Sequence, residues 1–283
     1  YRVQVALDEA FEHVCFDSGV QTMNRVCYPL EGVQLAPRTR YFWRVSKDAA
    51  SAASWFETAK LDEPWAAEWV QPDFDTSWHP QLFAGFKLDK KVVPARAYVC
   101  GLGLYEMAVN GRPAVDECLA PGLCAYDKWL PYQTYDLTDL LQTGENTLSV
   151  DLGNGWYKGY YGLNRRRNFR YGYEFALLCE VHITLDGGET ICVASNATDW
   201  QARRSTILDS SIFNGETRDD TMDTTAVYGV KPAGLGLDRL EARRTPPTRV
   251  MLKIKPKELI VTPNGDYVLD MGQNMVGWLA FEN

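Results

Sequence analysis

The sequence predicts an all-β chain of tandem β-sandwiches, and three observations support this prediction. Apolar and polar residues alternate at period two in seven separate segments, and Gly, Asn, Asp or Pro separates most of these segments. Helical periodicity is scarce. The alternating segments are residues 1–7, 41–48, 95–111, 146–153, 175–188, 189–195 and 267–283. Many short strands divided by turns pack most economically as sandwiches.

Composition shifts divide the chain into three expected domains. Residues 1–60 end in a Tyr-x-Trp strand and a Trp-Phe strand, which predicts a truncated fibronectin-like sandwich. Residues 61–245 follow a polar, proline-containing junction and hold the strand-rich body. A charged segment with a Pro pair then forms a linker, and residues 246–283 carry the last strands. Within the body, "VNGRPAV" and "LDGGET" predict hairpin turns, because Asn-Gly and Gly-Gly supply positive φ.

Charge and composition exclude several classes of partner. The formal net charge of −8 disfavours a nucleic-acid backbone. No segment approaches the length of a membrane-spanning helix, and none has the form of a signal peptide. The seven cysteines are an odd number, with no CxxC and no His at zinc-ligand spacing, so the sequence predicts no structural zinc site. Reduced thiols in apolar strands indicate a cytoplasmic protein, and secretion stays open because the chain does not begin with Met.

No catalytic constellation is visible in the sequence. The three histidines, His13, His79 and His182, fall in unlike contexts, and no nucleotide-binding or HExxH motif is present. A glycosidase whose two carboxylates converge within this chain is therefore the least favoured interpretation.

The segment "LGNGWYKGYYG", residues 152–162, is the strongest candidate for binding. It places four aromatic rings and four glycines beside one amide, Asn154. Aromatic faces stack on the C–H faces of sugars, and planar amides pair with hydroxyls. We therefore expect Asn110, Asn154, Trp156 and Tyr157 to bind carbohydrate. The same segment is equally typical of a β-bulge whose Trp packs into the core.

Glu216 lies in a second polar turn segment, "SIFNGETRDD". Oxygen ligands carried by such loops suit Ca²⁺, which prefers carboxylates and carbonyls in flexible geometry. Ca²⁺ is therefore the candidate ion, with Asn154 and Glu216 as its candidate ligands.

Several motifs in fixed order resemble the non-catalytic N-terminal region of bacterial α-L-rhamnosidases of glycoside hydrolase family 78. They include "GLYEMAVNG", "PYQTYDLTD", "GENTLSVDLGNGWYKG", "IFNGET" and "YVLDMGQNMVGW". The resemblance implies a rhamnosidase N-terminal jelly-roll over residues 61–245 and the first strands of a concanavalin-like β-domain over 246–283. It also implies a catalytic (α/α)₆ barrel elsewhere in the parent chain, because no long amphipathic helices occur here.

The resemblance leaves two functions open. The jelly-roll resembles a carbohydrate-binding module for L-rhamnose-containing glycosides, with Asn110, Asn154, Trp156 and Tyr157 at the matching positions. Alternatively, the β-domains are purely structural and brace the catalytic barrel. In either case we expect no hydrolysis by this chain itself.

Overall fold

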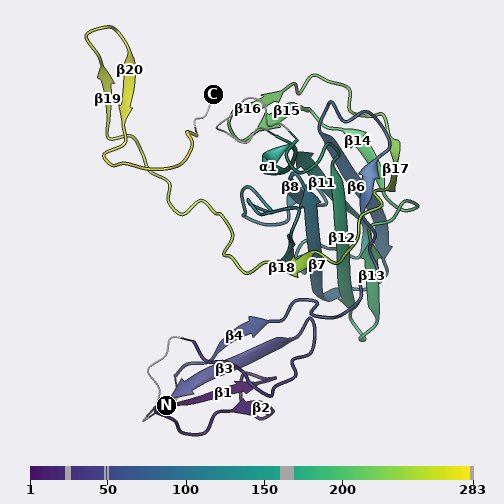
Figure 1. Ribbon diagram of the computed structural model, residues 1–283, viewed down its shortest axis with the longest axis vertical. Helices are drawn as coiled ribbons and strands as arrows, with labels where there is room; N and C mark the ends of the chain where they lie inside the picture. Colours follow the sequence, from purple (N-terminus) through teal and green to yellow (C-terminus); the bar gives the residue numbers. More distant parts are fainter. Residues whose placement is uncertain (23–26, 48, 50, 160–168, 281–283) are drawn as a thin grey trace.

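The computed structural model describes residues 1–283 except 23–26, 48, 50, 160–168 and 281–283 (Figure 1). The described residues form twenty strands and one helix, α1, which spans only Gly155–Lys158. The predicted all-β class is confirmed. No helix of the described residues is long and apolar enough to cross a bilayer.

An antiparallel sheet of four strands occupies the N-terminal end of the chain (Figure 1). Its order is β2 (Val14–Asp17), β1 (Arg2–Ala6), β3 (Arg40–Ser46) and β4 (Ser54–Glu57). Val3, Val5 and Tyr41 are buried on this sheet, and the Arg44 guanidinium lies 4.0 Å from the centroid of the Phe11 ring. A small core of β-branched and aromatic residues therefore holds the sheet together.

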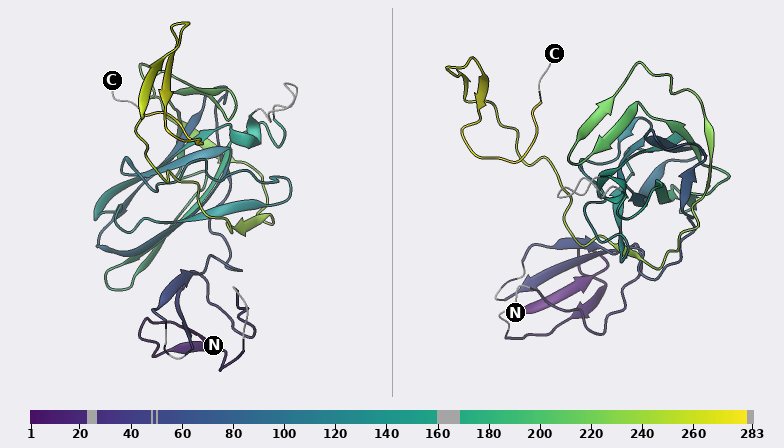
Figure 2. Two further views of the ribbon diagram at one scale, coloured as in Figure 1. Left: turned by 90° about the vertical axis from the view of Figure 1, so that its left-hand side faces the viewer. Right: turned by 45° about the horizontal axis from the view of Figure 1, so that its top comes forward.

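The body of the chain is a sandwich of two sheet layers (Figure 2). We name one the covered layer, consisting of β10 (Leu130–Asp136), β7 (Val92–Leu102), β12 (Ala176–Leu185), β13 (Thr190–Ala194) and β5 (Val70–Pro72). The other, the open layer, consists of β14 (Gln201–Arg204), β6 (Pro80–Leu88), β11 (Gly144–Gly153), β8 (Leu104–Val109) and β9 (Arg112–Pro113). Strand β17 (Tyr228–Pro232) pairs with β5 and β14 and so joins the layers, and β18 (Leu240–Ala242) extends the covered layer beside β10.

The main core fills the space between the two layers. Val99 and Val181 point inward from the covered layer, while Leu82, Leu148 and Val150 point inward from the open layer. All five are at most 1 % exposed. Burial of this apolar surface supplies the principal driving force for folding.

A second core lies on the outer face of the covered layer. Tyr98 and Leu178 of that layer pack there against Trp69, Tyr126 and the segments that carry them. Strands β7 and β12 are consequently buried on both faces over much of their length. The open layer differs, since its strands alternate between buried and accessible residues.

A buried ion pair attaches the segment after the N-terminal sheet to the covered layer. The Lys60 ammonium donates to Glu180 Oε1 at 2.5 Å, and both side chains are 1 % exposed. The backbone amides of Ala66 and Ala67 donate to Glu180 Oε2 at 2.7 and 3.2 Å. His182 Nε2 is hydrogen-bonded to Oε1. Glu180 thus receives donors from residues far apart in the sequence.

Both predicted hairpin turns are confirmed. Asn110 and Gly111 adopt positive φ between β8 and β9, and Gly187 and Gly188 do so between β12 and β13. Two further hairpins lie outside the sandwich layers: β15 (Ile207–Ser211) with β16 (Gly215–Arg218), and β19 (Glu258–Val261) with β20 (Tyr267–Asp270). The residues of β19 are all exposed.

We predict that Lys60→Met destabilises the chain by about 3–5 kcal/mol, because it leaves Glu180 as a buried charge with too few partners. The double variant Lys60→Met/Glu180→Gln should be more stable than Lys60→Met alone, since the uncompensated charge is gone. Urea unfolding of the three proteins measures these free energies. If the double variant were the less stable of the two, the ion pair would not be the source of the loss.

Candidate functional site

We name residues 152–162 the aromatic corner. The two rings of this corner that the structure describes face the protein. Helix α1 carries Trp156 and Tyr157, and both rings pack against the second core. The Tyr157 ring meets Tyr126 edge-on, with centroids 5.4 Å apart, and Tyr126 in turn lies 5.2 Å from Tyr171. Tyr160 and Tyr161 fall outside the described residues. The expected stacking positions, Trp156 and Tyr157, are therefore partly buried packing residues.

The glycines of this corner permit close approach of neighbouring segments. Gly155 has φ +52°, and a Cβ there would lie 2.6 Å from Leu104 Cγ. A Cβ on Gly153 would lie 2.6 Å from Ser210 Oγ in β15. Side chains at these positions would push β8 and the β15–β16 hairpin away from the corner. The glycine content thus serves packing between the end of β11, β8 and this hairpin.

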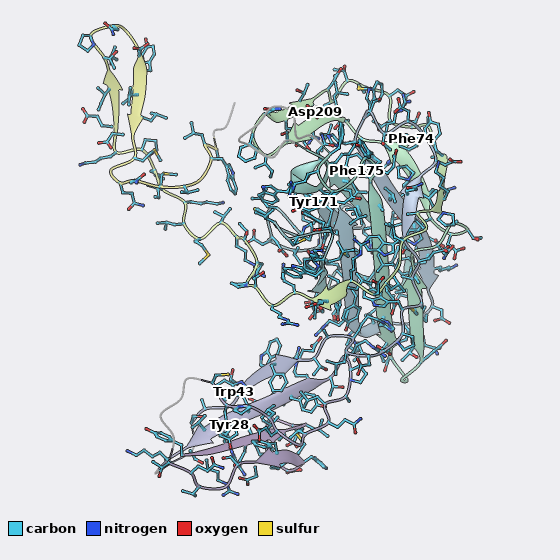
Figure 3. All side chains as sticks on the ribbon, viewed as in Figure 1. Tyr28, Trp43, Phe74, Tyr171, Phe175 and Asp209 are labelled. Atoms are coloured by element: carbon cyan, nitrogen blue, oxygen red, sulfur yellow. The ribbon has the colours of Figure 1, made fainter. Side chains whose placement is uncertain are left out.

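Asn154 precedes α1 and connects it to the β15–β16 hairpin. Its Nδ2 donates to Asp209 Oδ1 at 3.0 Å, and the same Asp209 oxygen lies 3.9 Å from His79 Nε2. His79 is buried, with its ring 5.3 Å from Phe175. Asp209 and Phe175 are labelled at this corner in Figure 3.

Burial dominates the electrostatics of His79. The pKa of His79 is lowered to about 4, mainly because burial disfavours the charged ring; the Asp209 carboxylate opposes this effect, and the Lys158 ammonium adds to it. The ring is therefore neutral at physiological pH. Burial also lowers the pKa of Lys158, whose Nζ donates to the Thr76 carbonyl at 3.0 Å.

Asn110 lies at the opposite end of the β8–β11 pair from Asn154. In that pair Val109 faces Leu148 and Leu104 faces Gly153, so the two asparagines are separated by roughly 17–20 Å of strand at about 3.3 Å per residue. The Asn110 amide is also engaged, because Nδ2 donates to Leu140 O and to Asn146 Oδ1 while Oδ1 accepts from Thr147 N. The structure does not bring Asn110 together with the other expected sugar-binding residues.

A groove of about 600 Å³ opens beside the corner, between the end of the β8–β11 pair and the β15–β16 hairpin. Gly153 and Gly155, the neighbours of Asn154, line one side of it. Its charged lining consists of Glu106, Asp151, Glu216 and Arg218. Carboxylates thus outnumber the one cation in the groove.

The groove continues into a row of polar side chains across the outer face of the open layer. Strand register places Glu106 beside Asp151, Asp151 beside Gln81, and Gln81 beside Arg203. Gln81 Nε2 donates to Asp151 Oδ2 at 2.9 Å, and Arg203 Nε donates to Gln81 Oε1 at 2.8 Å. Phe83, next on the same face of β6, lies 5.2 Å from the Arg203 guanidinium. The row presents planar polar groups and one ring on a single sheet face.

Asp151 is the most shielded acid of this row. Burial raises its pKa, the hydrogen bond from Gln81 opposes that rise, and the neighbouring Glu106 charge adds to it. The carboxyl accepts a hydrogen bond from Gln81 and has further acceptor capacity for a hydroxyl group.

The candidate Ca²⁺ ligands, Asn154 and Glu216, both lie at the groove, since Glu216 lines it and Asn154 sits between two lining glycines. Asn154 uses its Nδ2 on Asp209. Within the described part of the chain, Glu216 belongs to no group of three closely spaced His, Cys, Asp or Glu donors. The assignment of Ca²⁺ to these two residues stays a prediction.

Sequence reasoning missed the polar row. Glu106, Asp151, Gln81 and Arg203 each stand at an outward position of a different strand, and alternation alone marks such residues as ordinary surface. A usable signal was that Asp151 directly precedes the glycine-rich corner.

The two-layer sandwich and the flanking sheets place the chain among the all-β proteins with several sheets. It matches the family described as the alpha-L-rhamnosidase N-terminal domain over residues 90–251, more than half of its length. The chain therefore belongs to this family, and the resemblance found in the sequence is confirmed.

Individual relatives agree with this assignment. An alpha-L-rhamnosidase from Streptomyces avermitilis is 32% identical over 82% of this chain and 25% of its own length. The crystal structure of the rhamnosidase from Aspergillus terreus aligns with a TM-score of 0.84 at 27% identity, covering 98% of this chain and 35% of that one. The S. avermitilis rhamnosidase complexed with L-rhamnose, at 22% identity and a TM-score of 0.83 over 97% of this chain and 45% of that one, shares the fold. The chain thus spans a quarter to under a half of these relatives.

We predict that stability falls as pH drops from 6.5 toward 4, in part because His79 must gain a proton that its buried site disfavours. Its folded pKa of about 4 lies below the ordinary 6.5, so its contribution is present above pH 6.5 and lost as pH falls through the folded value. Urea unfolding across this range should show a shallower pH slope for His79→Asn. The exposed His13→Asn is the matched control, and equal slopes for both variants and the parent would contradict the assignment.

Proposed function

We propose that this chain is the non-catalytic N-terminal region of an α-L-rhamnosidase that hydrolyses terminal α-L-rhamnosides, and that its groove binds carbohydrate. Family membership supports the parent activity. The one helix of the described residues has four residues, so the proposal assigns bond cleavage to an (α/α)₆ barrel in another part of the parent chain. The proposed partners are an L-rhamnose-containing glycoside and that barrel.

The polar row supports the carbohydrate clause. Gln81, Asp151 and Glu106 offer planar groups on one accessible face. Arg203 Nε donates to Gln81 Oε1 and so holds the Gln81 amide in place. Planar amides and carboxylates pair with vicinal hydroxyls, and a neighbouring ring such as Phe83 covers a C–H face. This face replaces the aromatic corner as the proposed contact surface, with Asn154 at its edge.

A second candidate function is structural bracing of the catalytic barrel. It is favoured by the inward packing of Trp156 and Tyr157 and by the internal hydrogen bonds of Asn110. In this case the glycine-rich corner exists to join the sandwich to the β15–β16 hairpin, and the polar row is ordinary surface.

We predict weak binding of L-rhamnose, with a dissociation constant near the millimolar range, equivalent to about −4 kcal/mol. Calorimetric titration with and without Ca²⁺ measures it. Asp151→Asn combined with Glu106→Gln should abolish the heat, whereas Glu145→Gln, an exposed acid on the same strand β11, should leave it unchanged. Absence of heat at millimolar sugar in both buffers would reject the carbohydrate clause, and rapid release of rhamnose from a chromogenic glycoside would reject the non-catalytic clause.

We predict that Trp156→Ala lowers the unfolding free energy by about 1–3 kcal/mol, less than a fully buried Trp would lose, because the ring is only partly buried. Its effect on rhamnose affinity should be negligible, since the ring packs inward. Chemical unfolding and calorimetry on the same variant separate the two effects. If this variant lost sugar binding without losing stability, Trp156 would be a sugar-contacting residue, as first expected from the sequence.

A further inference from the structure

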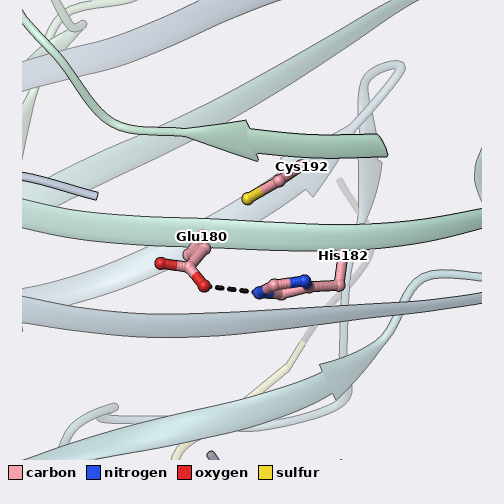
Figure 4. A group of neighbouring side chains, drawn as sticks. All are labelled: Glu180, His182 and Cys192. Atoms are coloured by element: carbon pink, nitrogen blue, oxygen red, sulfur yellow. Dashed lines mark hydrogen bonds and ion pairs between the residues drawn. The ribbon is translucent and has the colours of Figure 1, made fainter. Parts of the chain in front are cut away.

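Three side chains of metal-binding type converge on the outer face of the covered layer. His182 in β12 stands directly opposite Cys192 in β13, and Glu180 lies two residues before His182 on the same face. Their donor atoms all lie within 4.8 Å of one another (Figure 4). Strand pairing, rather than spacing along the chain, brings the thiol to the imidazole and the carboxylate.

We propose that Glu180, His182 and Cys192 form a binding site for a thiophilic divalent cation of the Zn²⁺ class. Thiolate, imidazole and carboxylate are the usual protein ligands of zinc, and three of them leave a fourth position for water. Among the described strands, the strand of Cys192, β13, pairs only with β12, and Cys192 itself is exposed, so a cation reaches the site from solvent. This site is separate from the groove of the proposed function and does not depend on it.

Lys60 is the group that a cation has to displace. Its ammonium shares Glu180 Oε1 with His182 Nε2, which places positive charge where a metal would bind. A second carboxylate oxygen, Glu63 Oε2, lies 3.7 Å from the same ammonium, and the Trp65 ring centroid lies 4.9 Å away. Lys60 therefore keeps a partner when Oε1 turns to the cation. The other oxygen, Oε2, stays on the amides of Ala66 and Ala67.

Binding replaces protons by the cation. The Cys192 thiol loses its proton to solvent. The proton that His182 Nε2 donates to Glu180 Oε1 also leaves Nε2, as the neutral ring takes the tautomer protonated at Nδ1, so that Nε2 and Glu180 Oε1 each coordinate with a lone pair.

The test is titration of chelator-treated protein with Zn²⁺ by calorimetry and with Co²⁺ by absorption. A thiolate-to-cobalt charge-transfer band is expected for the parent protein. Cys192→Ser should remove that band, and both Cys192→Ser and His182→Ala should weaken Zn²⁺ binding by more than about tenfold. Cys27→Ser and His13→Ala change an exposed thiol and an exposed imidazole elsewhere, and they should bind as the parent does.

Alkylation with iodoacetamide provides a second readout that does not require the variants to fold. The exposed thiols are Cys15, Cys27 and Cys192, and peptide mass mapping distinguishes them. Zn²⁺ should slow alkylation of Cys192 while leaving Cys15 and Cys27 unaffected. Equal protection of all three thiols, no protection of any, or Zn²⁺ affinity unchanged by Cys192→Ser would overturn the proposal and leave the cluster as an anchor for Lys60.

Discussion

The architecture depends on how Glu180 is satisfied in the middle of a buried strand. A carboxylate in that position is costly unless charges and donors surround it. Burial raises its pKa, but hydrogen bonds from His182 and Lys60 outweigh that effect and lower the pKa to about 2. Since Lys60 and the following amides must lie across the sheet to supply these donors, the ion pair fixes where the segment after the N-terminal sheet crosses the sandwich. A second ion pair, between Arg96 Nε and Glu57 Oε1 at 2.8 Å, joins β7 of the covered layer to β4 of the N-terminal sheet.

The sequence predicted which residues form strands, but it did not predict which faces of those strands are buried. Residues 175–188 alternate, which led to a strand prediction that β12 confirms. Alternation also marks Glu180 and His182 as solvent-facing, yet Glu180 is fully buried. The covering segment lies more than a hundred residues earlier in the chain, and no local pattern reports it. The contact between Cys192 and His182 has a local cause, because it is made across the β12–β13 hairpin that turns at Gly187 and Gly188.

In the aromatic corner, too, one feature has a local cause in the sequence and another depends on distant residues. Its glycines permit the close contacts that Gly153 and Gly155 make with neighbouring segments, which is a local property of the sequence. The direction of the rings depended on partners elsewhere: Tyr126 receives the Tyr157 ring, and Gly172 leaves room for its hydroxyl. Neither partner is adjacent in sequence, so the choice between a binding surface and a packed bulge could not be made from the segment itself.

The two faces of the sandwich consequently have different capacities for recognition. The ion pair and the second core occupy the outer face of the covered layer, so much of its surface is committed to holding the chain together. On the outer face of the open layer, the row from Glu106 to Arg203 is exposed or half-buried rather than fully buried, and its groups are aligned by the register of four strands. Rigid strands hold polar groups at fixed spacing with little further loss of entropy on binding. If a glycoside contacts this chain, physical chemistry therefore favours the open layer over the aromatic corner.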